Sequence, residues 1–410
     1  MADYNITLDE QMVRELFLSS YESGALKDLL TQVLNQILEG RAQDLCGAAL
    51  YEQTDERKDY RNGYRDRSLL TRFGKIELAV PRLRGQSVLG EGLIENYSRS
   101  EQALMAGVAE MVISGVSSRK VDAVALTLFG ESISKSQVSR VVKMLDPVVE
   151  EFRQRPLDEY YPFLIVDAMY IDVRKDGTPV SKALYIAIAI NTSGRREIVG
   201  IAVCDRESKE SYREFFKSIK ERGLERIDLA VSDSHEGLVE ALKAEFLGAS
   251  WQRCQTHFSK NMRDKCPKKV WGEAKEMLTA IYTARNIEEA RRQRDEALFL
   301  LVKEAPKAAE LLDSAFDDVT AVFSIPLKYR KKLRTSNMIE RLNEEIRRRE
   351  RPIRIFTNDD SVIRILGTVA MEIHDKWAVE RVLFDMGEYF GPCLTSVEKT
   401  SRDESERRAA

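Results

Sequence analysis

The run of sequence that decides the fold is Phe163-Leu164-Ile165-Val166-Asp167-Ala168-Met169-Tyr170-Ile171-Asp172-Val173. Its apolar, β-branched and aromatic side chains are typical of a strand. Because successive side chains of a strand point to opposite faces, Asp167 shares one face with four apolar residues, Ile165, Met169, Ile171 and Val173. Asp172 lies on the other face beside a charged turn, where we expect it to be solvated.

The segments after this run predict a mixed sheet. Two further β-rich runs, 183–191 and 197–203, complete an antiparallel meander. Beyond them the pattern predicts a helix, a strand, a helix and a last strand over 208–222, 227–232, 235–246 and 250–253. This order is that of the ribonuclease H-like fold, an α/β architecture with helices on both faces of the sheet. Residues 258 to about 322 are almost wholly helical and resemble an insertion into this core.

The carboxylate of Asp167 is the first candidate for chemistry. An ionised acid on a half-buried strand face either takes up a proton, with a raised pKa, or binds a cation, for which Mg²⁺ is a natural choice. The alternative is a structural aspartate that is hydrogen-bonded to the neighbouring backbone. The strand pattern by itself leaves both interpretations open.

Two further acids are candidates for the same site. Asp233 follows an apolar strand at its carboxyl end, where the sites of sheet proteins collect, although it also has the spacing of a helix N-cap with Glu236. Glu340 lies in the first turn of a later helix, with Asn337 at capping-box spacing, and Glu344 follows one turn further on the same face. Three converging carboxylates would hold two Mg²⁺ ions for an in-line displacement at phosphorus.

A basic stretch surrounds this third acid. From Lys328 to Arg354 the chain has eleven Lys and Arg residues and four Glu, a local charge of +7 in a chain whose net charge is -3. We expect the stretch to bind phosphates of DNA, and a solvated basic helix face is the alternative. The predicted DNA contacts in it are Arg334, Arg347, Arg348 and Arg349.

The N-terminal part predicts helices and one hairpin. Apolar residues recur at intervals of three and four over 8–50, with a break near Gly24. A polar linker over 51–63 then leads to a β-hairpin over 68–80, which has arginines on its flanks.

Between residues 101 and 150 two helices follow each other closely. The first covers 121–129 and the second opens at Ile133. Short polar and basic side chains, among them Lys135 and Arg140, suit a recognition helix that reaches base edges and phosphates. An ordinary pair of helices, without a role in DNA binding, has equal weight.

Composition bounds the remaining possibilities. The chain has 410 residues, enough for roughly two to four domains. No apolar run approaches the ~20 residues of a membrane span, and residues 1–8 lack the pattern of a signal peptide. The five cysteines are odd in number and scattered, which favours a reducing compartment. We therefore expect a cytoplasmic protein without a membrane partner.

Five motifs together indicate a family. The sequence from about Leu8 to about Gly391 resembles the bacterial insertion-sequence transposases of the Mutator-like superfamily. The motifs that carry the resemblance are YRNGYR (60–65) with VPRLR (80–84), VDAMYIDVR (166–174), VSDSHEGL (231–238), QRCQTH (252–257) and TSNMIERLN (335–343).

The resemblance implies a DDE transposase. In such an enzyme Asp167, Asp233 and Glu340 are the catalytic metal ligands for two Mg²⁺ ions, with Mn²⁺ as a substitute, and the N-terminal region recognises DNA ends. Family members usually have Gly after the first acid, whereas this chain has Ala168, a small side chain that should cost little.

Cys254 and His257 also belong to the family pattern, and their role is open. Two ligands do not complete a tetrahedral zinc site, so a metal role would need Cys266 or His235 as well. We favour a structural or DNA-positioning role for the pair.

The sequence therefore predicts a nucleoid-associated DNA transposase of an insertion sequence. It would nick the ends of the element and join the freed 3′-OH to another strand, by a copy-out and paste-in route that the family resemblance suggests. The expected partners are the terminal inverted repeats, target DNA and further copies of the chain in a homodimer or larger homo-oligomer. The alternatives are a domesticated, catalytically silent DNA-binding regulator and a ribonuclease H-like nuclease that uses water as its nucleophile.

The predicted domain limits follow from these elements. The N-terminal part comprises a helical region for DNA binding or dimerisation (1–65), a β-hairpin (66–95) and a helix-turn-helix-like region (96–156). The remainder comprises the first part of the core (157–257), the helical insertion (258–327), the second part of the core with the third acid (328–396) and a disordered tail (397–410).

Overall fold

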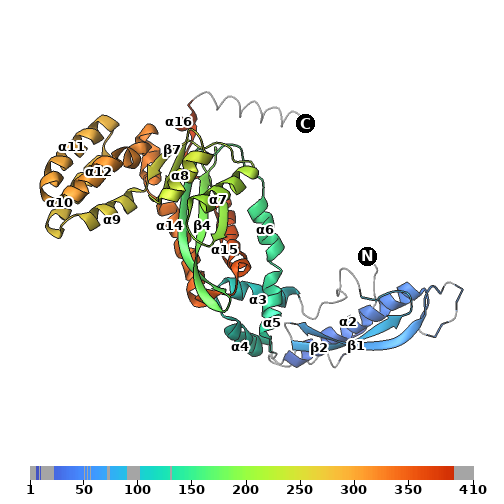
Figure 1. Ribbon diagram of the computed structural model, residues 1–410. Helices are drawn as coiled ribbons and strands as arrows, with labels where there is room; N and C mark the ends of the chain where they lie inside the picture. Colours follow the sequence, from blue (N-terminus) through green and yellow to red (C-terminus); the bar gives the residue numbers. More distant parts are fainter. Residues whose placement is uncertain are drawn as a thin grey trace, which may run out of the picture. The chain divides into compact units, whose positions relative to one another are not determined.

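The computed structural model in Figure 1 describes residues 6–8, 10, 23–49, 51, 52, 54, 55, 57–71, 74–89, 102–129 and 132–391. The chain forms two compact units, Met1–Met144 and Leu145–Ala410. The predicted domain limits stay predictions, and the predicted disordered tail over 397–410 lies outside the described residues. No helix of the described part is both long enough and apolar enough to cross a membrane.

In the first unit a helix packs on a β-hairpin. Helix α2, Ser23–Cys46, contributes Leu38 and Ala42 to a core that it shares with β2, Gly74–Leu83. Strand β1, Arg61–Thr71, pairs with β2 in antiparallel register. The hairpin is therefore longer than predicted, because its outer face is solvated and accepts the polar residues that resemble a linker.

Helix α2 begins at Ser23, next to the predicted break near Gly24. Residues 11–22 lie outside the described part of the chain, so the break itself stays a prediction. In the first turn of a helix a glycine costs little, since few intrahelical hydrogen bonds depend on it.

Three short helices complete the first unit. They are α3, Gln102–Ile113, α4, Ser118–Phe129, and α5, Lys135–Lys143. The Asp122 carboxylate accepts hydrogen bonds from Ser132 Oγ at 2.6 Å and from the Ile133 backbone N–H at 3.0 Å, which holds the turn between α4 and α5. Ser134 and Gln137 form a capping box at the start of α5.

The second unit is an α/β structure built on a six-stranded mixed sheet. Its main order is β5-β4-β3-β6-β7, and a short strand β8, Ile355–Phe356, pairs with the far end of β3. The antiparallel strands are β3, Phe163–Lys175, β4, Thr178–Ile190, and β5, Arg196–Cys204, whereas β6, Leu229–Ser232, and β7, Ser250–Arg253, run parallel to β3. The predicted meander is confirmed. Strand β4 begins before residue 183, because Asp176 and Gly177, both at positive φ, form a tight hairpin turn.

Helices cover both faces of this sheet (Figure 1). On one face α7, Lys209–Glu221, and α8, Glu236–Glu245, pack on Leu164, Val166 and Tyr185. On the other side lie α14, Asn337–Ile353, and α15, Asp359–Val379. Helix α6, Asp146–Gln154, joins α15 through the ion pair of Asp146 with Arg364, whose Nη2 donates at 2.8 Å.

The region predicted as a helical insertion is helical. It comprises α9, α10, α11, α12 and the 3₁₀ helix η1, with the bounds Gln255–Lys265, Lys268–Thr283, Ile287–Glu304, Pro306–Thr320 and Ala321–Ser324. These helices bury their own apolar core, which includes Phe258, Leu278 and Phe316. The first of them begins at Gln255, directly after β7. Helix α13, Leu327–Leu333, then leads to α14.

The long apolar helix α15 ends at Val379. Arg195 Nη1 donates to the carbonyls of Ala378, at 2.7 Å, and Glu380, at 3.0 Å. These contacts satisfy carbonyl groups at the end of the helix, so the chain turns and forms α16, Gly387–Phe390.

Helix α7 packs closely on strand β5 at Gly200. A Cβ atom at this position would lie 2.6 Å from the ring of Phe215 on α7. We expect Gly200→Ala to destabilise the fold by ~1–3 kcal/mol, because the ring is packed in the core and has to shift. Chemical denaturation measures this change. Gly272→Ala is the matched control, since no atom lies within 4 Å of the added Cβ in α10, and helix propensity makes that change neutral or stabilising. Equal stability of the two variants would contradict this packing.

Candidate active site

Strands β3 and β6 bring two acidic residues to the same level of the sheet. Ile165 pairs with Val231 in parallel register. Asp167 follows Ile165 by two residues, and Asp233 follows Val231 by two residues. Residues i and i+2 share a face, and neighbouring strands lie about 4.8 Å apart, so the backbone register places these two carboxylates beside each other.

The environment of Asp167 is costly for a charge. Burial, and after it the negative charge of Asp233, raise the pKa of Asp167 to about 6, against smaller opposing effects of His257 and of hydrogen bonds. This direction of the pKa shift agrees with the first of the outcomes that the strand pattern leaves open. Asp172 is exposed, as expected.

Asp233 does not cap the following helix. The N-cap of α8 is His235, whose backbone N–H donates to Asp233 Oδ1 at 3.2 Å. The alternative interpretation of Asp233 as an N-cap with Glu236 is wrong, because the helix begins two residues later. The hydrogen bond from His235 uses Oδ1 of Asp233 and does not involve Oδ2.

Asn343 is a site residue to which the sequence reasoning gave no role. Its Nδ2 donates to Asp167 Oδ2 at 2.8 Å, and its Oδ1 is buried without a hydrogen-bond partner. The available signal was the spacing from Glu340, since residues three apart on a helix share a face. Helix α14 thus covers the apolar face of β3, and its Asn343 side chain contacts Asp167, the carboxylate on that face.

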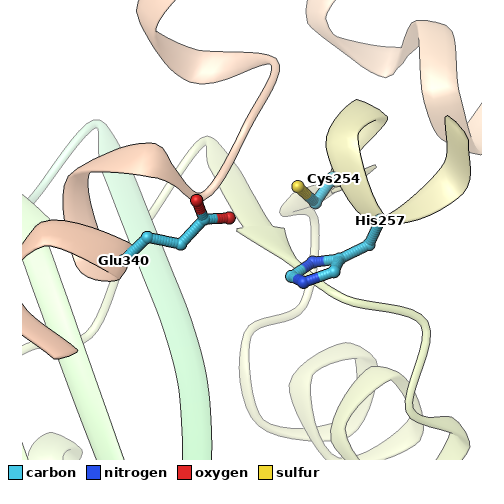
Figure 2. A group of neighbouring side chains, drawn as sticks. All are labelled: Cys254, His257 and Glu340. Carbon is cyan, nitrogen blue, oxygen red and sulfur yellow. The ribbon is translucent and has the colours of Figure 1, made fainter. Parts of the chain in front are cut away.

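Glu340 lies with Cys254 and His257 (Figure 2). One ligand atom of each of these three residues lies within 4.8 Å of the others. In the described part of the chain, the three predicted acids do not form such a group. His257 links the two places, because its charge acts on Asp167.

The predicted capping box of Asn337 and Glu340 is wrong. Helix α14 has Ser336 as its N-cap, without a side-chain hydrogen bond to the backbone, and Asn337 is its first residue. The Ser336 hydroxyl instead reaches Glu340 Oε1, at 3.2 Å, and Cys254 Sγ, at 3.2 Å. Glu344 is exposed on α14, whereas Glu340 is half-buried within this group.

The Cys254 thiol is fully buried at the N-cap of α9. Burial by itself raises its pKa, but hydrogen bonding with His257 and Ser336 outweighs burial and lowers the pKa of Cys254 to about 7. The same interaction with Cys254 raises the pKa of His257, against the effect of burial. The two side chains thus favour a charged pair.

The two residues considered as partners for Cys254 and His257 lie elsewhere. Cys266 is at the other end of α9, in the core of the insertion. His235 Nε2 lies 3.8 Å from Glu207 Oε2. The third member of the group is Glu340. Its distance along the chain from Cys254 and His257 gave no indication of this contact.

The predicted DNA-binding residues differ in exposure. Lys135, Arg140 and Arg347 are exposed, and Arg348 is exposed beside Glu345, with an N–O distance of 3.0 Å. Arg334 and Arg349 are half-buried. Arg334 Nη1 donates to the Tyr282 carbonyl at 3.3 Å, and Arg349 Nε is buried without a hydrogen-bond partner.

A basic pocket of about 410 Å³ lies next to the group of Cys254, His257 and Glu340. Helices α9 and α10 form it together with Arg334 and Thr335. Its lining includes Lys260, Arg263, Trp271 and Lys275. Cationic side chains around an aromatic ring suit a nucleic-acid strand.

Comparison with known proteins places the chain in a family. The model of the family described as "Transposase, Mutator family" matches residues 1–380. The transposase for insertion sequence element IS256 in transposon Tn4001 of Staphylococcus aureus is 39% identical over 380 residues, 92% of this chain and 97% of that protein. The transposase for ISRM5 of Rhizobium meliloti is 38% identical over 365 residues, 89% and 91% of the two chains. That for IS1081 of Mycobacterium tuberculosis is 39% identical over 353 residues, 86% and 85%. The chain therefore belongs to the Mutator family of transposases.

Proposed function

We propose that this protein is the DNA transposase of an insertion sequence and that Asp167, Asp233 and Glu340 are its catalytic acids. The observation that carries the proposal is the parallel register of β3 and β6 in a member of the Mutator family, because Asp167 and Asp233 each follow the last registered pair, Ile165 and Val231, by two residues. The strand order, with an antiparallel meander followed by parallel strands, supports a ribonuclease H-like core for the catalytic unit.

The acidic pair fits a magnesium site. Its donors are carboxylate oxygens, which Mg²⁺ prefers, and the burial and mutual repulsion that raise the pKa of Asp167 are relieved by a divalent cation. Asp167, Asp233 and Glu340 would hold two Mg²⁺ ions, for which Mn²⁺ would substitute. When bound, the ions polarise the attacking oxygen and stabilise the leaving oxygen at phosphorus.

The protein's own groups prepare this chemistry. Asn343 orients the Asp167 carboxylate through the hydrogen bond from Nδ2. The stiff pairing of β3 with β6 fixes the separation of the two aspartates. Glu340 lies in the first turn of α14, beside Cys254 and His257. In this proposal a change of its side-chain rotamer brings the carboxylate to the aspartates.

The reaction we propose has two steps. Water attacks the phosphorus at an element end, the P–O3′ bond breaks, and the 3′ oxygen leaves as a free hydroxyl. This 3′-OH then attacks a phosphorus of another strand, which forms a new P–O bond and releases the 3′ oxygen of that strand. We propose a copy-out and paste-in order for these steps, and a homodimer or larger oligomer on DNA, because two ends have to be held together.

DNA binding is divided between two regions in this proposal. In the first unit the capped helix α5 presents Lys135 and Arg140 to a terminal inverted repeat. In the second unit the exposed arginines of α14 and the basic pocket of α9 and α10 hold the strand near the acids. Phosphate contacts of this kind make affinity strongly dependent on salt.

The first test is Asp167→Asn. We expect it to abolish nicking and strand transfer of terminal-repeat DNA in Mg²⁺ and to preserve DNA binding, because it removes one carboxylate and leaves the basic surfaces intact. Strand-resolved gel analysis of the products measures both reactions. Normal cleavage by the variant would show that Asp167 is structural, and hydrolysis without joined products would favour a nuclease.

A stability measurement controls for misfolding of this variant. The folded pKa of Asp167, about 6, lies above the ordinary 3.8, so its ionisation destabilises the metal-free fold as pH rises through this range. In EDTA we expect Asp167→Asn to melt at a higher temperature than wild type near pH ~7.5 and at no higher temperature near pH ~4.

The second test separates two neighbouring glutamates. We expect Glu340→Gln to eliminate nicking and strand transfer with near-wild-type melting temperature, whereas the exposed matched control Glu344→Gln keeps measurable activity. The two changes remove the same charge from the same helix, one turn apart. The reverse ranking would assign the third ligand to Glu344.

The third test concerns α5. We expect the pair of substitutions Lys135→Ala and Arg140→Ala to weaken binding to terminal repeats and to reduce the salt slope of log affinity by about one for each lost phosphate contact. Fluorescence anisotropy at several salt concentrations measures the slope. Lys307→Ala, at an exposed lysine in the first turn of α12, is the matched control. An unchanged slope would favour an ordinary helix pair in this region.

A further inference from the structure

The group of Cys254, His257 and Glu340 joins the two ends of the helical insertion. Cys254 is the N-cap of α9 and His257 lies in its first turn, where the insertion begins. Glu340 lies in the first turn of α14, after the insertion has returned. The Gln255 backbone N–H also donates to the Arg334 carbonyl at 3.0 Å, so the ends are in direct contact.

We propose that Cys254 Sγ, the His257 imidazole and the Glu340 carboxylate form a binding site for Zn²⁺. A ligand atom of each lies within 4.8 Å of the others (Figure 2). Side-chain rotations that shorten these separations by about 1 Å bring all three to the bond distances of one tetrahedral ion. Three protein ligands leave the fourth position to water.

The donor set selects the metal. A thiolate and an imidazole are soft and borderline ligands, which favour Zn²⁺ over Mg²⁺ or Ca²⁺. Asp167 and Asp233 offer only carboxylate oxygens. The two neighbouring places are thus suited to different cations.

The hydrogen bonding around the group leaves one buried nitrogen without a partner. The single hydroxyl proton of Ser336 faces two acceptors, Cys254 Sγ and Glu340 Oε1, each at 3.2 Å. His257 Nδ1 is buried without a hydrogen-bond partner. An imidazole nitrogen in this state is available as a metal ligand. The Ser336 backbone N–H, 3.3 Å from Cys254 Sγ, also stabilises the thiolate that binds the metal.

Zinc at this site has a consequence for the acidic pair, which rests on the proposed function. Glu340 cannot serve both places at once, so bound Zn²⁺ keeps its carboxylate beside Cys254 and away from Asp167 and Asp233. We therefore expect Zn²⁺ to inhibit DNA cleavage in Mg²⁺ while it stabilises the fold.

The test is a titration of the full chain, freed of metal with EDTA, with Co²⁺ as a spectroscopic probe. We expect one equivalent of Co²⁺ to give thiolate-to-cobalt charge-transfer absorption and tetrahedral d–d bands, and one equivalent of Zn²⁺ to remove them. Cys254→Ser should abolish the charge-transfer band, whereas the matched control Cys266→Ser, another buried cysteine of α9, should keep it. Absence of the band in wild type, or its persistence in Cys254→Ser, would overturn the site.

The remaining ligands are tested by affinity. His257→Gln and Glu340→Gln should each raise the Kd for Co²⁺ by at least about tenfold, as loss of a ligand exceeds the effect of losing an outer partner. Circular dichroism checks that the variants are folded. If Cys254→Ser does not fold, the Glu340→Gln titration still decides, because wild-type affinity in that variant would contradict a three-ligand site.

Cleavage is a separate readout. Added Zn²⁺ should inhibit wild type more than Cys254→Ser at equal Mg²⁺, and equal inhibition would overturn the coupling through Glu340. A protein that binds Co²⁺ as expected but never cuts DNA would refute the proposed function alone. A protein that cuts DNA but shows no thiolate band would refute the zinc site alone.

Discussion

The parallel pairing of β3 with β6 is the constraint on which the catalytic unit depends. It sets Ile165 opposite Val231 and thereby sets Asp167 beside Asp233. The same strand β3 is antiparallel to β4 along its whole length, so it cannot slip by one residue without turning its apolar face outward. The sheet therefore holds two like charges in proximity, at a cost that is visible in the raised pKa of Asp167. Stability given up at a site of this kind is characteristic of function.

Buried amide side chains of Gln252 and Gln255 connect β7 and the start of α9 to the end of the helical insertion. Gln252 of β7 is fully buried; its Nε2 donates to the Val319 carbonyl at 2.9 Å, and its Oε1 accepts from the Val322 backbone N–H at 2.7 Å. Gln255 Nε2 donates to the same Val319 carbonyl at 2.9 Å. Breaking such bonds leaves buried polar groups unpaired, which costs about 1–3 kcal/mol for each group. The end of α12 is thus fixed to β7, and the start of α14 is brought back beside Cys254.

Glu340 connects the two halves of this arrangement. Its carboxylate lies with Cys254 and His257, and the helix that carries it also carries Asn343, which donates to Asp167. A rotamer change is faster and cheaper than a movement of α14, because the helix is packed through Ile339, Leu342 and Ile346. In the proposed mechanism the chemistry at the sheet is coupled to the ends of the insertion through this one side chain.

The sequence by itself determined the local structure. The alternating pattern of 163–173 predicted β3 and placed Asp167 on an apolar face, and residues 258 to about 322 were predicted to be helical. Only the tertiary structure decided that Arg195 bonds the end of α15, that Asn343 meets Asp167 and that Glu340 meets Cys254 and His257. The reason is physical. Periodicity reports which face of an element is buried, but it carries no information on which distant element covers that face, and each of these contacts joins segments that are far apart in the chain.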